Sequence, residues 1–243
     1  MDIENSVVLI TGASSGIGEA TARAAAAAGA RVVLAARREE RIRALAEELP
    51  DARAVPCDVT DAAQLAQAVR TAVDVHGRLD VLVNNAGQGL HVPLEDVDPA
   101  DFRAVLDLNV VAPLAAMQAV LPVMRRHGAG SIVNVSSGTT LVVRPGAGAY
   151  AASKAALNML SSVARLELAD AGIVVSTVYP FITATEFHSS LRAGALQAPP
   201  REAPPELRPQ RPEQVAEVIL ELIRTGAERA DLVPERFGGS YRD

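Results

Sequence analysis

A tyrosine and a lysine four residues apart carry the clearest chemical signal in the sequence. Tyr150 and Lys154 lie at the start of a predicted helix, where this spacing places both side chains on one face. A free phenol has a pKa of about 10 and is a poor base near neutral pH. A lysine ammonium about 5 Å away, at an effective dielectric near 20, contributes roughly 3 kcal/mol, or about two pKa units, in favour of the phenolate. The pair therefore predicts proton transfer to or from a substrate oxygen.

A serine precedes this pair at the end of a predicted strand. Ser137 lies thirteen positions before Tyr150, at the C-terminal end of the strand that reads Ser131-Ile132-Val133-Asn134-Val135. Open α/β sheets bind ligands at the carboxyl ends of their strands, so the hydroxyl is expected to hold the substrate oxygen and to stabilise negative charge on it. Ser136 is the neighbouring alternative. Taken one at a time, these residues are also typical of helix caps and surface packing.

A glycine-rich turn joins the first predicted strand to a helix composed largely of alanine. Its spacing is Gly-x3-Gly-x-Gly, which differs from the Gly-x-Gly-x-x-Gly of many dinucleotide-binding folds. Bare backbone N–H groups and the positive end of a helix dipole bind a pyrophosphate, and glycine lets the chain approach it closely. An ordinary turn is the alternative, but the flanking elements favour a nucleotide site. The residues expected to form the site are Gly12, Ser14, Ser15, Gly16, Ile17 and Gly18.

The end of the second predicted strand indicates which dinucleotide the site selects. NAD-selective sites place a carboxylate there to bind the ribose hydroxyls, but this strand ends in Arg37 and Arg38. Two guanidiniums, with Ser14 in the turn, suit the 2′-phosphate of NADP(H). The alternative is that both arginines begin a solvated helix in which Glu39 and Glu40 neutralise them. The sequence therefore predicts NADP(H) as the cofactor.

Short β-branched runs alternate with longer helical patterns along the chain. Several of the runs are continuously apolar, as expected of strands that helices cover on both faces. The sequence therefore predicts an α/β fold, a single-domain Rossmann-type doubly wound parallel sheet with helices on both faces. The predicted strands are residues 7–11, 31–36, 52–58, 81–84, 131–136 and 173–179, and the predicted helices are residues 16–28, 39–49, 61–76, 101–127, 150–170 and 212–225.

Length and composition fit a globular chain of one domain spanning residues 1–243. Hydrophobic residues make up 49 % and charged residues 21 % of the 243 residues, enough to bury a sizeable core. The net charge of −6 lacks the basic excess of nucleic-acid-binding proteins. A proline-rich segment within residues 187–212 cannot be regular structure and is expected to be a lid or loop.

Other features bear on location and metal binding. The first residues lack a signal-peptide pattern and Cys57 is the single cysteine, so we expect a cytoplasmic protein. The uncharged stretch at residues 108–124 favours a buried or interface helix over a membrane span. The histidines have no metal-ligand spacing, so we expect no metal and solvated side chains. They are His76, His91, His127 and His188.

Five further blocks follow the glycine turn. They are Asp58-Val59, Asn84-Asn85-Ala86-Gly87, Asn109, Ser136-Ser137 and Tyr150-x3-Lys154. With the turn, their order and intervals resemble the short-chain dehydrogenase/reductase family of the NADP(H)-preferring type, over residues 7 to about 185. The resemblance implies an oxidoreductase that transfers a hydride between NADP(H) and a small or medium apolar ketone, aldehyde or secondary alcohol.

The resemblance also implies a role for each block. In reduction, Ser137 would stabilise the substrate oxygen, Tyr150 would protonate it, and Lys154 would lower the phenol pKa and bind the ribose. Asn109 would interrupt its helix and hold a water that links Lys154 to solvent. The adenosine half of the cofactor would contact Asp58, Val59, Asn84, Ala86 and Gly87.

The chain departs from the family after the sixth predicted strand. The family has Pro-Gly-x-Val/Ile-x-Thr there, and its backbone and threonine hold the nicotinamide carboxamide. Pro180 and Thr185 fit this pattern, whereas Phe181 replaces the glycine and Thr183 an aliphatic residue. Pro180, Thr183 and Thr185 are still expected to contact the cofactor. Phe181 is expected to alter the turn or to place a ring beside the nicotinamide.

Helices at residues 105–124 and 151–168 are apolar over more than one face, which predicts a homodimer or homotetramer.

The substrate would contact the loops at residues 88–98, 138–149 and 181–212, whose apolar members predict an apolar pocket. These members are Leu90, Val92, Leu141, Val142, Val143 and Phe187.

Three other classes of protein are alternatives. A non-catalytic, NADP(H)-binding regulatory Rossmann protein would be expected to lack Ser137, Tyr150 or Lys154, and none is missing. A sugar-nucleotide epimerase or dehydratase would need a larger C-terminal substrate domain. An S-adenosylmethionine methyltransferase leaves the Tyr–Lys pair unexplained.

Overall fold

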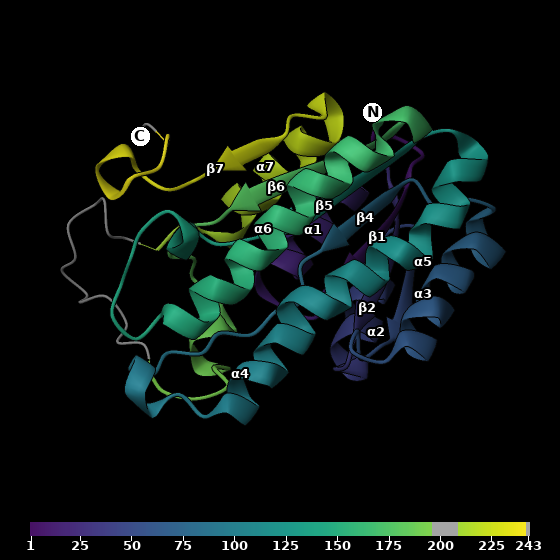
Figure 1. Cartoon of the computed structure of the whole chain (residues 1–243). Helices are drawn as coiled ribbons and strands as arrows, with labels where there is room; N and C mark the ends of the chain where they lie inside the picture. The colour runs from purple at the N-terminus through teal and green to yellow at the C-terminus, as the bar shows by residue number, and fades with distance from the viewer. Residues whose placement is uncertain (196–208, 242–243) are drawn as a thin grey trace.

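A seven-stranded parallel sheet forms the centre of the molecule (Figure 1). The computed structural model describes residues 1–195 and 209–241. The strand order is β3-β2-β1-β4-β5-β6-β7, and each neighbouring pair is parallel. The predicted doubly wound α/β fold is therefore confirmed. The strands are β1 Val7–Thr11, β2 Arg31–Ala36, β3 Ala52–Pro56, β4 Val81–Asn84, β5 Gly130–Val135, β6 Ile173–Tyr179 and β7 Arg229–Asp231.

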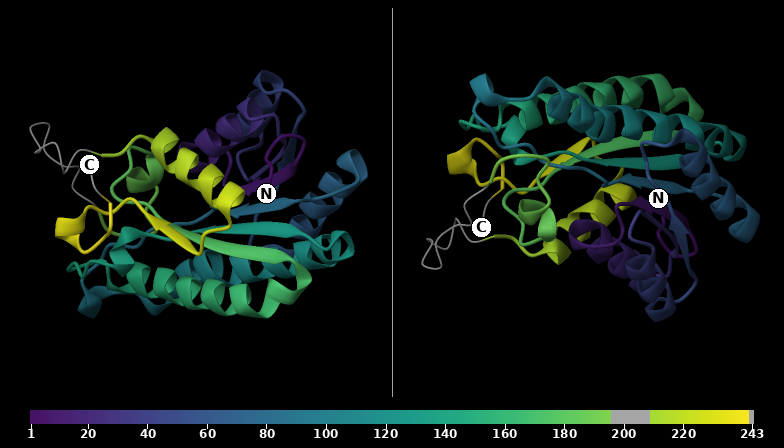
Figure 2. Two further views of the ribbon diagram at one scale, coloured as in Figure 1. Left: turned by 90° about the horizontal axis from the view of Figure 1, so that it is seen from above. Right: turned by 90° about the horizontal axis from the view of Figure 1, so that it is seen from below.

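Helices cover both faces of the sheet. Residues of α1, α2 and α7 form the core on one face, and residues of α3, α5 and α6 form the core on the other. Figure 2 shows α7 and the pair α5–α6 on opposite sides of the strands. The helices are α1 Gly16–Ala27, α2 Glu39–Glu48, α3 Ala62–His76, α4 Pro99–Leu106, α5 Ala112–His127, α6 Gly148–Leu168 and α7 Pro212–Thr225.

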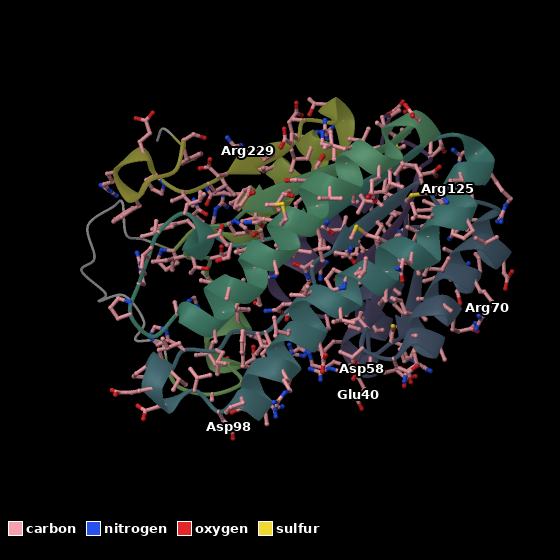
Figure 3. The ribbon with its side chains drawn as sticks, in the orientation of Figure 1. Glu40, Asp58, Arg70, Asp98, Arg125 and Arg229 are labelled. Atoms are coloured by element: carbon pink, nitrogen blue, oxygen red, sulfur yellow. The ribbon has the colours of Figure 1, made fainter. Side chains whose placement is uncertain are left out.

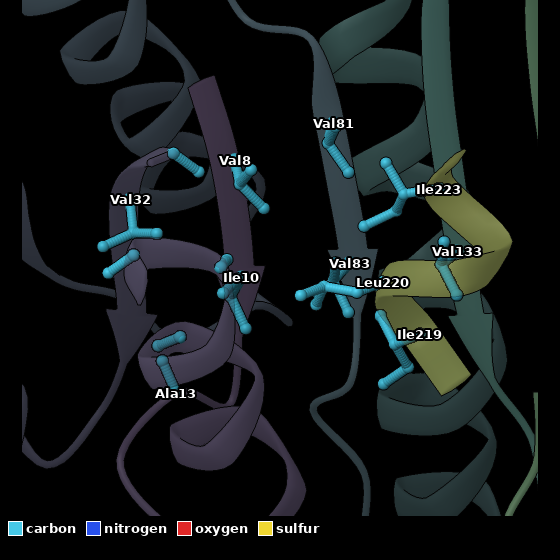
Figure 4. Packing of buried hydrophobic residues seen from close by; sticks show 14 of the residues in the cluster. Val8, Ile10, Ala13, Val32, Val81, Val83, Val133, Ile219, Leu220 and Ile223 are labelled. Atoms are coloured by element: carbon cyan, nitrogen blue, oxygen red, sulfur yellow. The ribbon is translucent and has the colours of Figure 1, made fainter. Parts of the chain in front are cut away.

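The core on the first face ties three strands to α7 (Figure 4). β-Branched side chains of β1, β4 and β5 meet the apolar stripe of this helix, and α7 also packs against α1. This packing fixes α1, and therefore the glycine turn before it, relative to the sheet. The labelled members of this core are Val8, Ile10, Ala13, Val32, Val81, Val83, Val133, Ile219, Leu220 and Ile223.

The predicted helix at residues 101–127 consists of three segments. It begins earlier, at Pro99, because the Asp98 side chain accepts a hydrogen bond from Ala100 N at 2.7 Å and caps α4. A π-helical segment, η2 Asp107–Val111, then separates α4 from α5. The interruption expected at Asn109 is therefore confirmed. Single π-helical turns are common at functional sites.

The continuous run Pro99–His127 is the one helix among the described residues with the length and composition to cross a membrane. About 39 % of its most apolar window is buried in this molecule. Six of its buried residues belong to the core on the second face of the sheet. They are Ala112, Ala116, Met117, Val120, Val123 and Met124.

The sequence does not predict β7, because its three residues include two charged side chains and no apolar run. β7 pairs with β6, and the chain after it folds back on itself. The Asp231 carboxylate accepts hydrogen bonds from Ser240 N at 2.9 Å and from Ser240 Oγ at 2.7 Å. These bonds hold the C-terminal segment, residues 232–241, beside the carboxyl end of β6.

The predicted proline-rich lid falls partly outside the described residues. Residues 196–208 are not described. Residues 187–189 belong to a short 3-10 helix, η5 Glu186–Ser189. Gln210 N donates to Ile182 O at 2.7 Å, so the returning chain pairs with the segment after β6.

Charged side chains lie mainly on the periphery. Figure 3 shows Glu40, Arg70 and Arg125 directed away from the ribbon, and all three are exposed. Asp58, which follows β3, is only partly exposed. Because the strands are parallel, their carboxyl ends meet at one edge of the sheet. The connections leave β1 in opposite directions toward β2 and β4, which opens a crevice at that edge.

Candidate active site

A cavity of about 590 Å³ lies at the carboxyl edge of the sheet. Its walls come from the ends of β1, β2, β4, β5 and β6, from the first turns of α6 and from η5. Most residues singled out from the sequence line it. They are Gly12, Ser14, Ser15, Gly16, Ile17, Arg37, Arg38, Asp58, Val59, Ala86, Gly87, Ser137, Tyr150, Lys154, Pro180, Thr183 and Thr185.

The start of α1 is arranged to receive an anion. Ser15 is the N-cap residue, but its side chain does not cap the helix. Its hydroxyl instead accepts a hydrogen bond from Arg38 Nη2. Gly12 and Gly16 have φ of 66° and 59°, a conformation that residues with a side chain rarely adopt. The first turn of α1 therefore has no side-chain cap where it lines the cavity, and its free N–H groups fit a pyrophosphate.

Gly18 lies behind this wall rather than in it. A Cβ added at Gly18 would lie 2.4 Å from Gly12 O and 2.5 Å from Asn85 Nδ2. The third glycine therefore permits close packing of α1 on the turn and on the end of β4.

Asn85 and Thr11 join the turn to the end of β4. Asn85 Nδ2 donates to Thr11 O at 3.0 Å and to Gly12 O at 3.2 Å. Asn85 N and Ala86 N both donate to Thr11 Oγ1, at 3.0 and 3.1 Å. The neighbouring Asn84 does not reach the cavity. Its amide donates to Asn134 Oδ1 at 2.9 Å in the buried core, so its role in the structure is to hold the sheet together.

Two cations and two hydroxyls gather at one end of the cavity. Arg38 Nε donates to Ser14 Oγ at 3.0 Å, and Arg37 lies on the same wall. The arginines therefore do not merely begin a solvated helix. Asp58 lies nearby, and a hydrogen bond from the Thr60 hydroxyl lowers the pKa of its carboxyl.

Ser137, Tyr150 and Lys154 line the cavity where β5 ends and α6 begins. Burial raises the pKa of Tyr150 to about 12, although a hydrogen bond with the Ser137 hydroxyl opposes this change. Burial also lowers the pKa of Lys154 to about 8. Lys154 Nζ donates to Val135 O at 2.9 Å, so a backbone carbonyl compensates the buried ammonium. The expected lowering of the Tyr150 pKa by Lys154 is thus not seen, because desolvation of the phenol dominates in this structure.

The two candidate serines have different surroundings. Ser136 Oγ donates to Asn158 Oδ1 at 2.5 Å, so its hydroxyl is engaged with α6. Ser137 Oγ accepts from Thr139 N at 3.2 Å and from Thr139 Oγ1 at 2.9 Å, and its own proton remains available to Tyr150 or to a substrate oxygen. This arrangement favours Ser137 for the role expected from the sequence.

Asn109 lies behind Lys154 in the π-helical segment and is fully buried. Its Oδ1 accepts from Gln88 N at 3.0 Å, and its Nδ2 donates to Gln88 O at 2.9 Å and to Ser153 Oγ at 3.0 Å. A Cβ added at Gly87 would lie 3.2 Å from Asn109 Oδ1 and 3.3 Å from Lys154 Nζ. Because Gly87 has no side chain, the Asn109 amide and the Lys154 ammonium can both lie close to its backbone.

The segment after β6 explains how the chain accommodates Phe181. The Phe181 ring stacks on the Phe237 ring of the C-terminal segment, with centroids 5.3 Å apart and planes at 23°. Thr185 packs on the turn, since a Cβ added at Gly16 would lie 2.9 Å from Thr185 Cγ2. Nothing in the sequence pointed to Phe237 as the partner of Phe181, because the two residues are 56 positions apart and Phe237 belongs to no motif.

Apolar side chains form the wall next to Tyr150. Leu90, Val142 and Phe187 line the cavity, as expected, and the Phe187 ring centroid lies 5.7 Å from that of Tyr150. Val143, by contrast, is fully exposed. The sequence did not predict that two histidines also form part of this wall. His91 and His188, expected to be solvated, both line the cavity, and burial lowers the pKa of His188.

Comparison with known proteins gives a consistent set of relatives. The model of the family described as short chain dehydrogenase matches residues 6–195. Over 220 residues the chain is 39 % identical to sulfoacetaldehyde reductase 2 of Chromohalobacter salexigens, a match that covers 88 % of this chain and 86 % of the relative.

Two solved structures are similar in fold over nearly the whole chain. One is a 3-ketoacyl-(acyl-carrier-protein) reductase from Brucella melitensis complexed with NADH, with a TM-score of 0.86, 30 % identity and coverage of 95 % of this chain and 97 % of that one. The other is an alcohol dehydrogenase from the archaeon Thermococcus sibiricus complexed with 5-hydroxy-NADP, with a TM-score of 0.82, 27 % identity and coverage of 94 % and 96 %.

The packing of Gly18 generates a prediction about stability. Gly18→Ala is expected to destabilise the chain by about 1–3 kcal/mol, because the added methyl overlaps the Gly12 carbonyl and the Asn85 amide. Urea denaturation followed by circular dichroism measures the change. Gly148→Ala is the matched control, since its nearest neighbour would be Leu94 Cδ1 at 3.9 Å. Equal midpoints for both variants would contradict the packing role.

Proposed function

The chain belongs to the short-chain dehydrogenase family of oxidoreductases, and we propose that it transfers a hydride between NADP(H) and a small or medium apolar ketone, aldehyde or secondary alcohol. One observation carries the proposal. The glycine turn and the group Ser137–Tyr150–Lys154 open on the same cavity, although about 120 positions separate them in the sequence. A site that binds a nucleotide at one end and holds a proton donor at the other is suited to carbonyl reduction.

The side chains divide the proposed chemistry among themselves. NADP(H), when bound, supplies or accepts the hydride. Tyr150 delivers the proton to the carbonyl oxygen in reduction, and its high pKa in this structure keeps it protonated at neutral pH. Ser137 donates a hydrogen bond to the same oxygen and stabilises its negative charge. Lys154 is placed to bind the ribose and to restore the proton to Tyr150, with Asn109 as its buried neighbour.

The arginines support NADP(H) over NAD(H). Arg37 and Arg38 line the end of the cavity that follows β2, and Ser14 contributes a hydroxyl. Guanidiniums form charge-assisted, bidentate hydrogen bonds with phosphate. The adenosine half would lie against Asp58, Val59, Ala86 and Gly87, and the nicotinamide beside Pro180, Thr183 and Thr185.

The apolar wall supports an apolar substrate, and the relatives support a carbonyl or alcohol group as the reacting group. Leu90, Val142 and Phe187 surround the approach to Tyr150. The named relatives are reductases or dehydrogenases of carbonyl and alcohol groups. A regulatory protein that only binds NADP(H) is not favoured, because all three reactive side chains face the cavity.

We further propose a homodimer or homotetramer in the cytoplasm. Large apolar side chains are exposed along α6 and at the end of η2. They are Val111 at 54 %, Met159 at 67 %, Val163 at 42 % and Leu166 at 79 % exposure. Such a stripe on two neighbouring elements is typical of a subunit interface. A reducing compartment suits a chain whose single cysteine, Cys57, is a buried thiol.

Removal of one hydroxyl tests the proposed reaction. Tyr150→Phe is expected to lower kcat for carbonyl reduction by about 10²–10⁴-fold, because the proton donor is lost. The binding constant for NADPH should change little. Turnover is followed by the absorbance of NADPH at 340 nm in a screen of ketones and aldehydes, with both cofactors. Tyr179→Phe removes a hydroxyl outside the cavity lining and should retain activity. Turnover by Tyr150→Phe at the rate of the unmodified protein would contradict the proposal.

The raised pKa of Tyr150 also predicts a pH dependence. Reduction requires the protonated phenol, which persists from pH 6 to 9 because the pKa lies near 12. Oxidation of the alcohol requires the phenolate, whose fraction increases with pH over the same range. Initial rates of oxidation should therefore rise from pH 7 to 9, and those of reduction should not. Oxidation rates that fall as the pH rises over this range would be inconsistent with Tyr150 as the base.

The oligomer is tested by light scattering coupled to size-exclusion chromatography. The unmodified chain, of 25.4 kDa, should elute at two or four times that mass. Leu166→Glu should shift it toward the monomer, because a charge would be buried in the interface. A monomeric mass for the unmodified chain at micromolar concentration would rule out this interface.

A further inference from the structure

A carboxylate already occupies the cationic end of the cavity. Glu186, the first residue of η5, accepts a hydrogen bond from Arg38 Nη1 at 2.6 Å. It also accepts two hydrogen bonds from Arg41 Nη1 of α2, both at 2.8 Å. Glu186 lies 148 positions from Arg38 in the sequence and lines the same cavity. The contact thus joins the segment after β6 to the end of β2.

All three guanidinium nitrogens of Arg38 donate hydrogen bonds. Its Nε and Nη2 donate to Ser14 and Ser15 of the glycine turn, and its Nη1 donates to Glu186. The two serines therefore orient the guanidinium, and Glu186 takes the donor that they leave free. A phosphate bound by Arg38 beside Ser14 would meet this carboxylate, and two anions on one guanidinium repel each other.

The ion pairs are strong enough to compete and weak enough to be displaced. Glu186 is ionised at neutral pH, since the hydrogen bonds from Arg38 and then Arg41 lower the pKa of its carboxyl. About half of each side chain is exposed, 45 % for Arg38 and 49 % for Arg41 and Glu186. Exposed ion pairs contribute little to stability, whereas a phosphate dianion can bind a guanidinium through two oxygens.

We propose that Glu186 is a specificity-determining residue that competes with the 2′-phosphate of NADP(H) for Arg38 and Arg41. The inference rests on the proposed function, because it assumes that the cationic end receives the adenosine ribose. Glu186 lowers the affinity for NADP(H) and leaves the affinity for NAD(H) unchanged, since NAD(H) has no phosphate to displace it. Arg41, which the sequence did not single out, is a second phosphate ligand.

Calorimetric titration with NADPH and with NADH tests the proposal by binding, without turnover. Glu186→Gln keeps the shape of the side chain and removes its charge. We expect this variant to bind NADPH about three- to twentyfold more tightly than the unmodified chain, because two competing exposed ion pairs are lost. Its affinity for NADH should stay within about twofold of that of the unmodified chain. Glu40→Gln is the matched control, because it removes an exposed charge next to Arg41 on α2, and it should change the ratio of the two affinities by less than about twofold.

The outcomes separate this inference from the proposed function. If the unmodified chain prefers NADPH but Glu186→Gln leaves the ratio of affinities unchanged, the competition is refuted and the cofactor assignment stands. If Glu186→Gln weakens NADPH binding, Glu186 orients the arginines instead of competing, and the inference is also refuted. If the unmodified chain shows no preference and Glu186→Gln creates one, the competition is supported and the assignment of NADP(H) to the natural chain fails. No preference in either protein would refute both.

Discussion

Parallel strands that end at one edge of the sheet are the constraint on which this site depends. Adjacent strands in the order β1-β4-β5-β6 are hydrogen-bonded to each other. The residues that follow these strands are therefore neighbours in space, whatever their distance along the chain. The glycine turn follows β1, Ala86 and Gly87 follow β4, and Ser137 follows β5. Thr11 and Asn85 strengthen this arrangement by hydrogen-bonding the turn to the end of β4. The chemistry of the cavity is therefore a consequence of strand order.

Burial of a cation beside a phenol is the second requirement of the site. Lys154 is only 4 % exposed, and an unpaired buried ammonium is costly. Val135 O compensates part of this cost, and the π-helical segment brings the fully buried Asn109 close to Gly87 beside the lysine. The same low-dielectric surroundings raise the pKa of Tyr150 and lower that of Lys154. Both shifts favour neutral side chains, so charge on a bound cofactor would act strongly on the pair.

The sequence predicted what is local or repeated. Strand and helix bounds agree within a few residues, because apolar runs, Gly16 and Pro212 mark them, and the motif residues lie where parallel strands must place them. It did not predict the contacts that Arg38 and Phe181 make with distant residues outside any motif, Glu186 and Phe237. Nor did it predict the direction of the Tyr150 pKa shift, because helix spacing gives the distance to Lys154 but not the desolvation of the phenol. The three charged or small residues of β7 carry no pattern that distinguishes a short edge strand from a loop.

A crystal structure with NADP⁺ bound would show whether one cavity binds the nucleotide on the glycine turn and presents its ribose to Tyr150 and Lys154. We expect pyrophosphate oxygens within about 3 Å of backbone N–H groups at residues 12–18, and ribose hydroxyls within hydrogen-bond distance of Tyr150 Oη and Lys154 Nζ. A nucleotide bound elsewhere, or one whose ribose lies beyond about 6 Å from both side chains, would contradict it.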